Sequence, residues 1–197
     1  MTVLTVVLLS LTGLTPALTR PVHRLVADPV LPIAGLAVLL LGAAATAAAV
    51  SEQAPTGWLS AATLVVGVAA ATGAGSPVVR GVFRLVRREF LPRRTPADLS
   101  PEQPPGASTA EPAAQRPQQP ETVLRGGAWI GYLERVAVTA TLLAGWPEGI
   151  ALVLGVKGVG RYAELRESNA PEAFIIGTLA SLLWAAAVAG TVELLRG

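Results

Sequence analysis

The chain has 197 residues, of which 52% are hydrophobic and 14% are charged, with a formal net charge of +2 and a mean hydropathy of +0.55. Soluble domains carry about 25% charged residues, so this composition excludes an ordinary soluble domain. The absence of cysteine also excludes disulfides and thiolate chemistry.

The apolar residues are arranged in blocks that match the length of membrane spans. A helix of about 20 residues crosses a hydrocarbon core of about 30 Å. Five blocks fit this length, at 2–19, 30–50, 58–79, 127–146 and 172–194. A sixth block, 150–161, is short and rich in glycine. The sequence therefore predicts an all-α polytopic transmembrane protein with about six spans, or five spans plus a re-entrant segment at 150–161.

A proline-rich stretch at 92–122 separates two membrane parts. It holds half of the 16 prolines, together with Gln, Ser and Thr. Such a composition cannot bury enough apolar surface to fold. We therefore predict a disordered linker at 92–122, between a three-span N-terminal half (1–91) and a C-terminal membrane module (123–197).

Basic residues near the ends of the spans predict the orientation in the membrane. Arg20 and Arg24 follow the first block, and six arginines at 80–94 follow the third. In the 51–57 loop, the only charged residue is Glu52. Cytoplasmic loops are enriched in Lys and Arg, so we expect a cytoplasmic linker and both termini outside. Fourteen of the 15 basic residues are arginine and alanine is abundant, which is typical of a GC-rich bacterial genome. We therefore expect the bacterial plasma membrane.

The segment 80–91 has the pattern of a basic amphipathic helix that continues from the third span. Its apolar residues fall on one side, and four arginines fall towards the other: Arg80, Arg84, Arg87 and Arg88. This pattern favours contact with anionic lipid headgroups, although positive-inside orientation alone also explains it. We expect no nucleic acid as a partner.

The most unusual residues are the charges inside the apolar blocks. Glu134 and Arg135 are adjacent within 128–146, and Lys157, the single lysine, lies in the short sixth block. At 1.5 Å per residue, Glu134 lies about 9 Å inside the cytoplasmic edge of the apolar core. Buried charges at this depth need partners.

Counting back from the turn at 147–149 gives the expected partners. Arg161 reaches a depth similar to that of Glu134, and Glu164 comes level with Arg135. We therefore predict the cross-helix pairs Glu134–Arg161 and Arg135–Glu164, with Lys157 as a second possible partner for Glu134. This network is either a structural lock for the hairpin or a proton or ion site that lines a polar cavity.

Small residues recur at helical spacing in two blocks. Such stripes let transmembrane helices approach closely. The predicted packing residues are Gly67, Ala71 and Gly75 in the third block, and Gly177, Ser181, Ala185 and Ala189 in the last. They serve either internal contacts or an oligomer.

No pattern in the sequence indicates catalysis. The single histidine, His23, has only Asp28 near it, and no His, Asp and Glu cluster has the spacing of metal ligands. The sequence around Lys157, Gly-Val-Lys-Gly-Val-Gly, lacks the Gly-Lys-Ser/Thr ending of a phosphate-binding loop. We therefore expect neither an enzyme, nor a cofactor, nor a metal site.

The C-terminal part carries a distinctive series of short motifs. In order, these are Ile-Gly-Tyr-Leu-Glu-Arg at 130–135, Gly-Val-Lys at 155–157, Arg161 with Glu164, and Phe-Ile-Ile-Gly-Thr-Leu-Ala-Ser-Leu at 174–182. Over about 126–192, the chain resembles the C-terminal membrane module of an uncharacterised bacterial integral-membrane family. The resemblance implies a membrane location and a shared role for a set of residues: Glu134, Arg135, Lys157, Arg161, Glu164, Gly177, Thr178 and Ser181. The N-terminal half lacks the His- and Asp-bearing pattern of the domain that accompanies this module.

Two functions remain open at this stage. The first is a membrane scaffold, assembly factor or regulatory subunit that acts through helix packing with a membrane-protein partner or a second copy. The second is a small transporter or channel component that uses the intramembrane charges Glu134, Arg135, Lys157 and Arg161.

Overall fold

The computed structural model describes residues 1–18, 29–52, 54–90, 126–160, 162 and 170–197. These residues form six α-helices and one 3-10 helix, without a strand. The elements are α1 (Thr2–Leu14), η1 (Thr15–Leu18), α3 (Val30–Ala49), α4 (Trp58–Phe90), α5 (Gly126–Leu143), α6 (Gly149–Gly160) and α7 (Ala170–Arg196). The all-α prediction is confirmed for the described part of the chain. The predicted linker at 92–122 lies outside it.

Three of the helices are long and apolar enough to cross a membrane. They comprise Val30–Ala49, Trp58–Arg87 and Pro171–Arg196. Thr2–Ala17 and Gly149–Gly160 are shorter apolar helices. At 1.5 Å per residue, the 12 residues of α6 extend about 18 Å, which is less than a hydrocarbon core of about 30 Å. The structure thus agrees with a membrane protein, and the count of six spans stays a prediction.

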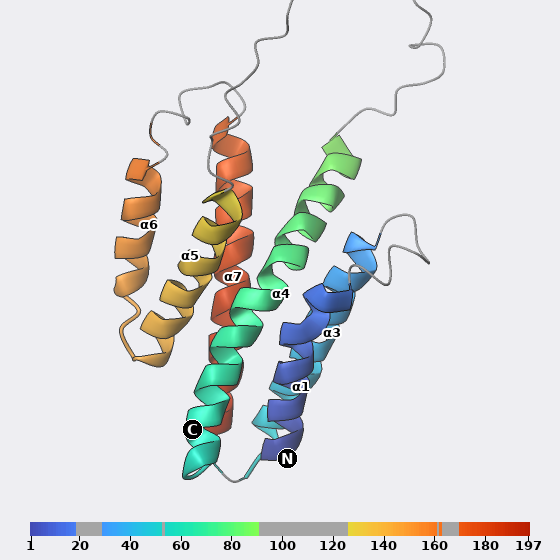
Figure 1. Ribbon diagram of the computed structural model, residues 1–197, viewed down its shortest axis with the longest axis vertical. Coiled ribbons are helices and arrows are strands. Elements are labelled where there is room, and N and C mark those ends of the chain that lie inside the picture. Colours follow the sequence, from blue (N-terminus) through green and yellow to red (C-terminus); the bar gives the residue numbers. More distant parts are fainter. Residues whose placement is uncertain (19–28, 53, 91–125, 161, 163–169) are drawn as a thin grey trace, which may run out of the picture.

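Helix α4 is the central element of the bundle. It packs against α1, α3, α5 and α7 (Figure 1). The predicted third span and the predicted basic segment form one continuous helix of 33 residues up to Phe90, with the buried Pro77 inside it. Of the basic residues in that segment, Arg80 and Arg87 are exposed and Arg84 is half-buried.

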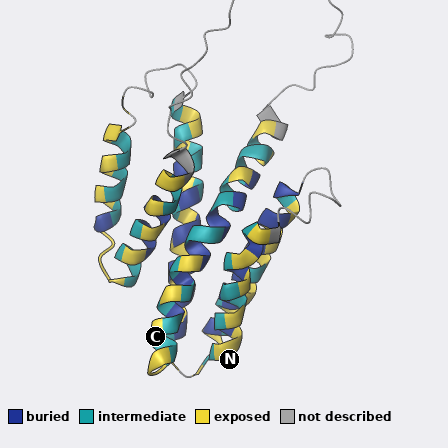
Figure 2. Cartoon of the chain, viewed as in Figure 1, coloured by how far each residue is buried: buried dark blue, intermediate teal, exposed yellow. Residues whose placement is uncertain are grey.

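The core lies where α1, α3, α4 and α7 meet. It consists of small and branched apolar side chains together with Trp184: Leu9, Ala37, Leu41, Ala44, Ala70, Ala71, Ala74, Val188 and Val192. The buried positions face the interior of the bundle, and exposed ones line the outer faces (Figure 2). Many exposed positions are large and apolar, such as Leu39 and Leu183, as expected where the neighbour is lipid.

The backbones of α1 and α4 approach each other closely. A Cβ placed at Gly73 would lie 2.6 Å from the Gly13 carbonyl oxygen, and one placed at Gly13 would lie 3.3 Å from the Ala70 Cα. Only glycine permits this crossing. Gly13 and Gly73 therefore also belong to the packing residues, although neither lies in one of the predicted small-residue stripes.

Most hydroxyl groups of the helices are satisfied within their own helix. Thr12 Oγ1 donates a hydrogen bond to the Leu8 carbonyl oxygen at 2.8 Å, and Thr191 Oγ1 donates to that of Ala187 at 2.9 Å. This local bond is the usual solution for threonine where no water is at hand.

The chain enters and leaves the bundle at one end. Both termini lie at the end opposite the one where α4 finishes and α5 begins (Figure 1). Between α5 and α6, residues 144–148 form a turn in which Gly145 has a φ of +68°. Helix α6 then runs back alongside α5 towards the end where α5 began, and it packs mainly against α5 (Figure 1).

Candidate functional site

Glu134 and Lys157 form an ion pair that links α5 and α6. Lys157 Nζ lies 2.6 Å from each oxygen of the Glu134 carboxylate. The two side chains are 6% and 17% exposed, respectively. The Lys157 ammonium also lies 5.4 Å from the centre of the Phe174 ring on α7, a cation–π distance. The pair therefore joins α6 to the rest of the bundle.

One of the partners that the sequence allowed for Glu134 is seen in the structure. Lys157, the second possibility, occupies both carboxylate oxygens. Arg161 and Glu164 lie outside the described residues, so the pairs Glu134–Arg161 and Arg135–Glu164 stay predictions.

Arg135 points away from Glu134, towards α4. Its Nη2 donates a 2.9 Å hydrogen bond to Ser76 Oγ, and its guanidinium carbon lies 5.3 Å from the centre of the Tyr132 ring. Adjacent helical residues lie about 100° apart and do not face each other, which explains why the two neighbouring charges have separate partners. Arg135 is 4% exposed, and none of the described residues forms an ion pair with it.

Glycine on α4 makes room for the Arg135 side chain. A Cβ placed at Gly75 would collide with Cδ of Arg135 and would lie 3.0 Å from its Cζ. The arginine thus lies across the α4 backbone at a position where any other residue would displace it.

These charges line a partly open cavity of about 860 Å³ between α4, α5, α6 and α7. Its lining includes the Glu134–Lys157 pair, Arg135, and the exposed Arg80. Ligand pockets in proteins typically measure about 300–1,000 Å³. The volume is therefore sufficient for a small molecule or for the headgroup of a lipid.

Two hydroxyl groups in the same cavity lack hydrogen-bond partners. Thr178 and Ser181 on α7 are 7% and 4% exposed, and neither Thr178 Oγ1 nor Ser181 Oγ has a partner among the described residues. Arg135 Nε is also buried without one. This cluster contrasts with Thr12 and Thr191, whose hydroxyls bond to their own helix.

The predicted small-residue stripes lie inside the bundle. On α4, Gly67 meets Val192 of α7, where a Cβ would lie 2.6 Å from Val192 Cγ2. Ala71 accepts a 3.1 Å hydrogen bond from the Trp184 indole Nε1 through its backbone carbonyl. On α7, Ser181, Ala185 and Ala189 are buried, and Gly177 lies against the ring of Phe83. The structure therefore uses both stripes for contacts within one chain, mainly between α4 and α7.

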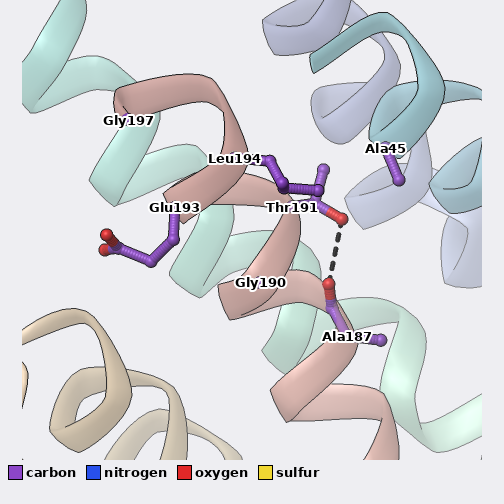
Figure 3. A pocket seen from close by; sticks show the side chains of 7 residues that line it. All are labelled: Ala45, Ala187, Gly190, Thr191, Glu193, Leu194 and Gly197. Carbon is purple, nitrogen blue, oxygen red and sulfur yellow. Dashed lines mark hydrogen bonds between the residues drawn. The ribbon is translucent and has the colours of Figure 1, made fainter. Parts of the chain in front are cut away.

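The remaining surface features form no comparable site. Arg88 belongs to the predicted lipid-facing arginines, but its side chain lies outside the described residues. A hollow of about 640 Å³ at the far end of α7 is lined mainly by small residues, and its Thr191 is bonded to Ala187 (Figure 3). Within the described ranges, no group of three or more His, Cys, Asp or Glu residues is placed to hold a metal ion.

Ser76, Tyr132 and Phe174 contribute to the charged site, and reasoning from the sequence did not identify their roles. Phe174 and Tyr132 are aromatic residues near the ends of apolar blocks, where membrane-interface positions are common. Ser76 gave a detectable signal, because it is a polar residue beside Gly75 and Pro77 within an apolar helix.

No protein-family model, curated protein or solved structure matches this chain significantly. The resemblance of 126–192 to a bacterial membrane module therefore rests on the quoted residues alone.

Proposed function

We propose that this protein is an integral-membrane scaffold, assembly or regulatory component that acts by holding a partner membrane protein against α6. The observation that carries the proposal is the loose attachment of α6. It packs mainly against α5, and the Glu134–Lys157 pair adds a polar attachment. Three of its large side chains are highly exposed: Leu152, Val156 and Val159.

Glycines on α6 support the same proposal. A Cβ at Gly155, Gly158 or Gly160 would meet nothing within 4 Å. Each glycine in a helix costs about 1 kcal/mol relative to alanine, and no contact with another described residue accounts for that cost here. Small residues on a transmembrane helix allow close approach of another helix.

Site-specific photo-crosslinking in native membranes tests the proposal. A photoreactive residue replaces Val159 on α6, which is 80% exposed, and a control replaces Leu39 on α3, which is 73% exposed. We expect a discrete protein adduct from position 159 and none from position 39, identified by mass spectrometry after purification in mild detergent. Equal labelling at both positions, or lipid adducts alone, contradicts the proposal.

A matched pair of substitutions tests the glycines. Gly158→Leu enlarges the α6 surface, and Gly42→Leu does the same on α3, where a Cβ also meets nothing within 4 Å. We expect Gly158→Leu alone to reduce co-purification of the partner. If the two variants retain the partner equally, α6 is not the docking helix.

A second candidate, a small transporter component, is favoured by the charged cavity itself. Glu134, Arg135 and Lys157 line a space that is partly open, and charges within a membrane often mark ion pathways. The packed core around Trp184 and Val188 argues against a continuous channel. In proteoliposomes, a transporter requires that Glu134→Gln abolish flux while the protein still inserts, and unchanged flux excludes this role.

For the topology, we propose six spans in a bacterial plasma membrane, with a cytoplasmic linker and both termini outside. The shared end of the two termini supports this arrangement (Figure 1). The chain has no cysteine, so single cysteines at Gly197 and Ser108 report their sides directly. We expect an impermeant maleimide to label position 197, but not position 108, in intact cells. The reverse pattern overturns the proposed orientation.

A further inference from the structure

The charges that line the cavity do not balance. Among its described lining residues, Arg80, Arg135 and Lys157 are basic and Glu134 is acidic. Lys157 and Glu134 neutralise each other at 2.6 Å. Among the described residues, the side-chain partners of Arg135 are the neutral Ser76 and Tyr132. A buried guanidinium without an anion is strongly disfavoured in a medium of low dielectric constant, so the site is suited to receive a negative charge.

The unpartnered hydroxyls lie on the facing helix. Thr178 and Ser181 are three positions apart, so both occupy one face of α7. Their oxygens are buried without partners among the described residues and belong to the same cavity as Arg135. One guanidinium and two hydroxyl donors together match a group with several acceptor oxygens and at least one negative charge.

We propose that this cavity binds a phosphate group, with Arg135 as the charged ligand and with Thr178 and Ser181 as hydroxyl donors. A phosphate offers more acceptor oxygens than a carboxylate, and arginine recognises it through paired N–H groups. The exposed Arg80 lies at the same cavity and adds further positive potential.

The apolar part of the lining fits the phosphate of a lipid. Phe83, Ile130, Val156 and Phe174 share the cavity with the charged groups, and Ile130 and Val156 are exposed on the outer surface. A lipid phosphate would reach Arg135 while its chains remain along this apolar border. The inference goes beyond the scaffold proposal and does not depend on it, because the cavity is formed by one chain.

Binding of soluble phosphate compounds to the purified full chain tests the assignment. The probes are dioctanoyl phosphatidic acid, dioctanoylglycerol as the same lipid without phosphate, and inorganic phosphate. Native mass spectrometry in detergent gives the dissociation constants. We expect phosphatidic acid to bind at least about tenfold more tightly than dioctanoylglycerol, a difference of about 1.4 kcal/mol. Binding of phosphatidic acid alone identifies a lipid as the source, and equal binding of inorganic phosphate identifies a free anion.

Substitutions inside and outside the cavity test whether the phosphate group binds there. We expect Arg135→Gln to weaken phosphatidic acid binding by about tenfold or more, and Thr178→Val with Ser181→Ala to weaken it several-fold. The control is Thr139→Val, because Thr139 Oγ1 is also buried without a partner but does not line the cavity. Arg196→Gln removes a positive charge far from the site.

Three results overturn the proposal. They are equal binding of dioctanoylglycerol and phosphatidic acid, wild-type affinity in the Thr178 and Ser181 double variant, and equal loss in the Thr139→Val control. If Arg135→Gln does not fold, Arg135→Lys preserves the charge while removing the paired donors, and the hydroxyl variants stand as an independent test. None of these measurements involves a protein partner, so failure here leaves the α6 proposal to its own crosslinking test.

Discussion

The Arg135 side chain lies across Gly75, so that the α5 guanidinium is held against the α4 backbone beside Ser76. One glycine thereby fixes the position of the only buried charge in the described chain that has no oppositely charged partner. The contact between α4 and α5 at Gly75 therefore also positions Arg135 in the charged site.

Gly75→Ala should destabilise the protein, because its new Cβ would overlap Arg135. Overpacking typically costs about 1–3 kcal/mol, which exceeds the gain of about 1 kcal/mol in helix propensity. The free energy of unfolding, measured by titration with sodium dodecyl sulfate, should fall. Gly190→Ala is the control, since its Cβ meets nothing within 4 Å, and it should be neutral or stabilising. Equal effects in the two variants would contradict the contact.

Gly73→Ala should loosen the packing of α1 on α4. Its Cβ would lie 2.6 Å from the backbone oxygen of Gly13. A backbone atom cannot rotate out of the way as a side chain can, so α1 and α4 must move apart. We expect a loss of about 2 kcal/mol in the free energy of unfolding. Gly42→Ala on α3, with open space at its Cβ, serves as the reference. If Gly73→Ala is as stable as that reference, α1 and α4 lie farther apart than in the structure.

Single neutralisation of the Glu134–Lys157 pair should cost more than double neutralisation. Removing one partner of a buried ion pair leaves the other charge unpaired and typically costs about 3–5 kcal/mol. We expect Glu134→Gln and Lys157→Met each to lower the free energy of unfolding substantially, and the double variant to recover much of the loss.

A double-mutant cycle quantifies this coupling. The exposed pair Glu193–Arg196, with its 2.9 Å contact, is the control, and pairs of this kind contribute at most about 1 kcal/mol. Additive effects at Glu134 and Lys157 would mean that the two residues do not form the pair.

Trp184→Phe should weaken the contact between α4 and α7. The substitution removes the indole N–H that donates to the Ala71 carbonyl oxygen at 3.1 Å, and a bond of this type contributes about 1 kcal/mol. Thermal unfolding in detergent should occur at a lower temperature. Trp58→Phe, at a highly exposed position, should leave the midpoint temperature of unfolding unchanged. If the two variants lower this temperature equally, the hydrogen bond of the Trp184 indole does not stabilise the contact between α4 and α7.

Apolar block lengths were sufficient to predict the helices, because periodicity and composition are local properties. The ends of α3 agree with the predicted block 30–50 to within one residue. The block 58–79 and the basic segment predicted to continue from it form one helix, α4, up to Phe90. The change from apolar to basic residues after position 79 does not interrupt the backbone hydrogen bonds of this helix.

The partner of Glu134 was harder to predict, because it depends on the width of a turn. The predicted hairpin placed span ends at 146 and 150, which brings Glu134 level with position 162, next to Arg161. In the structure α5 ends at Leu143 and α6 begins at Gly149. Counted from these ends, Glu134 comes level with Gly158, one residue after Lys157. The turn at 144–148 thus shifts the register, and the flexible lysine side chain covers the difference.

The sequence could not show whether the small-residue stripes pack within one chain or between two copies. Spacing identified Gly67, Ala71 and Gly75 as a packing face, but an internal interface and an oligomer require the same spacing. Likewise, nothing local to Ser76 indicated that a residue 59 positions later would bond to it. Such long-range pairs depend on how the helices are arranged.

The α5–α6 hairpin returns to the end of the bundle from which it departs (Figure 1). The start of α5, the end of α6 and the start of α7 therefore lie at the same end of the bundle. A shallow hairpin and a fully inserted one leave α7 with the same sidedness. The direction of α7 through the bundle, and with it the end at which the C-terminus lies, is therefore independent of the length of the α5–α6 hairpin.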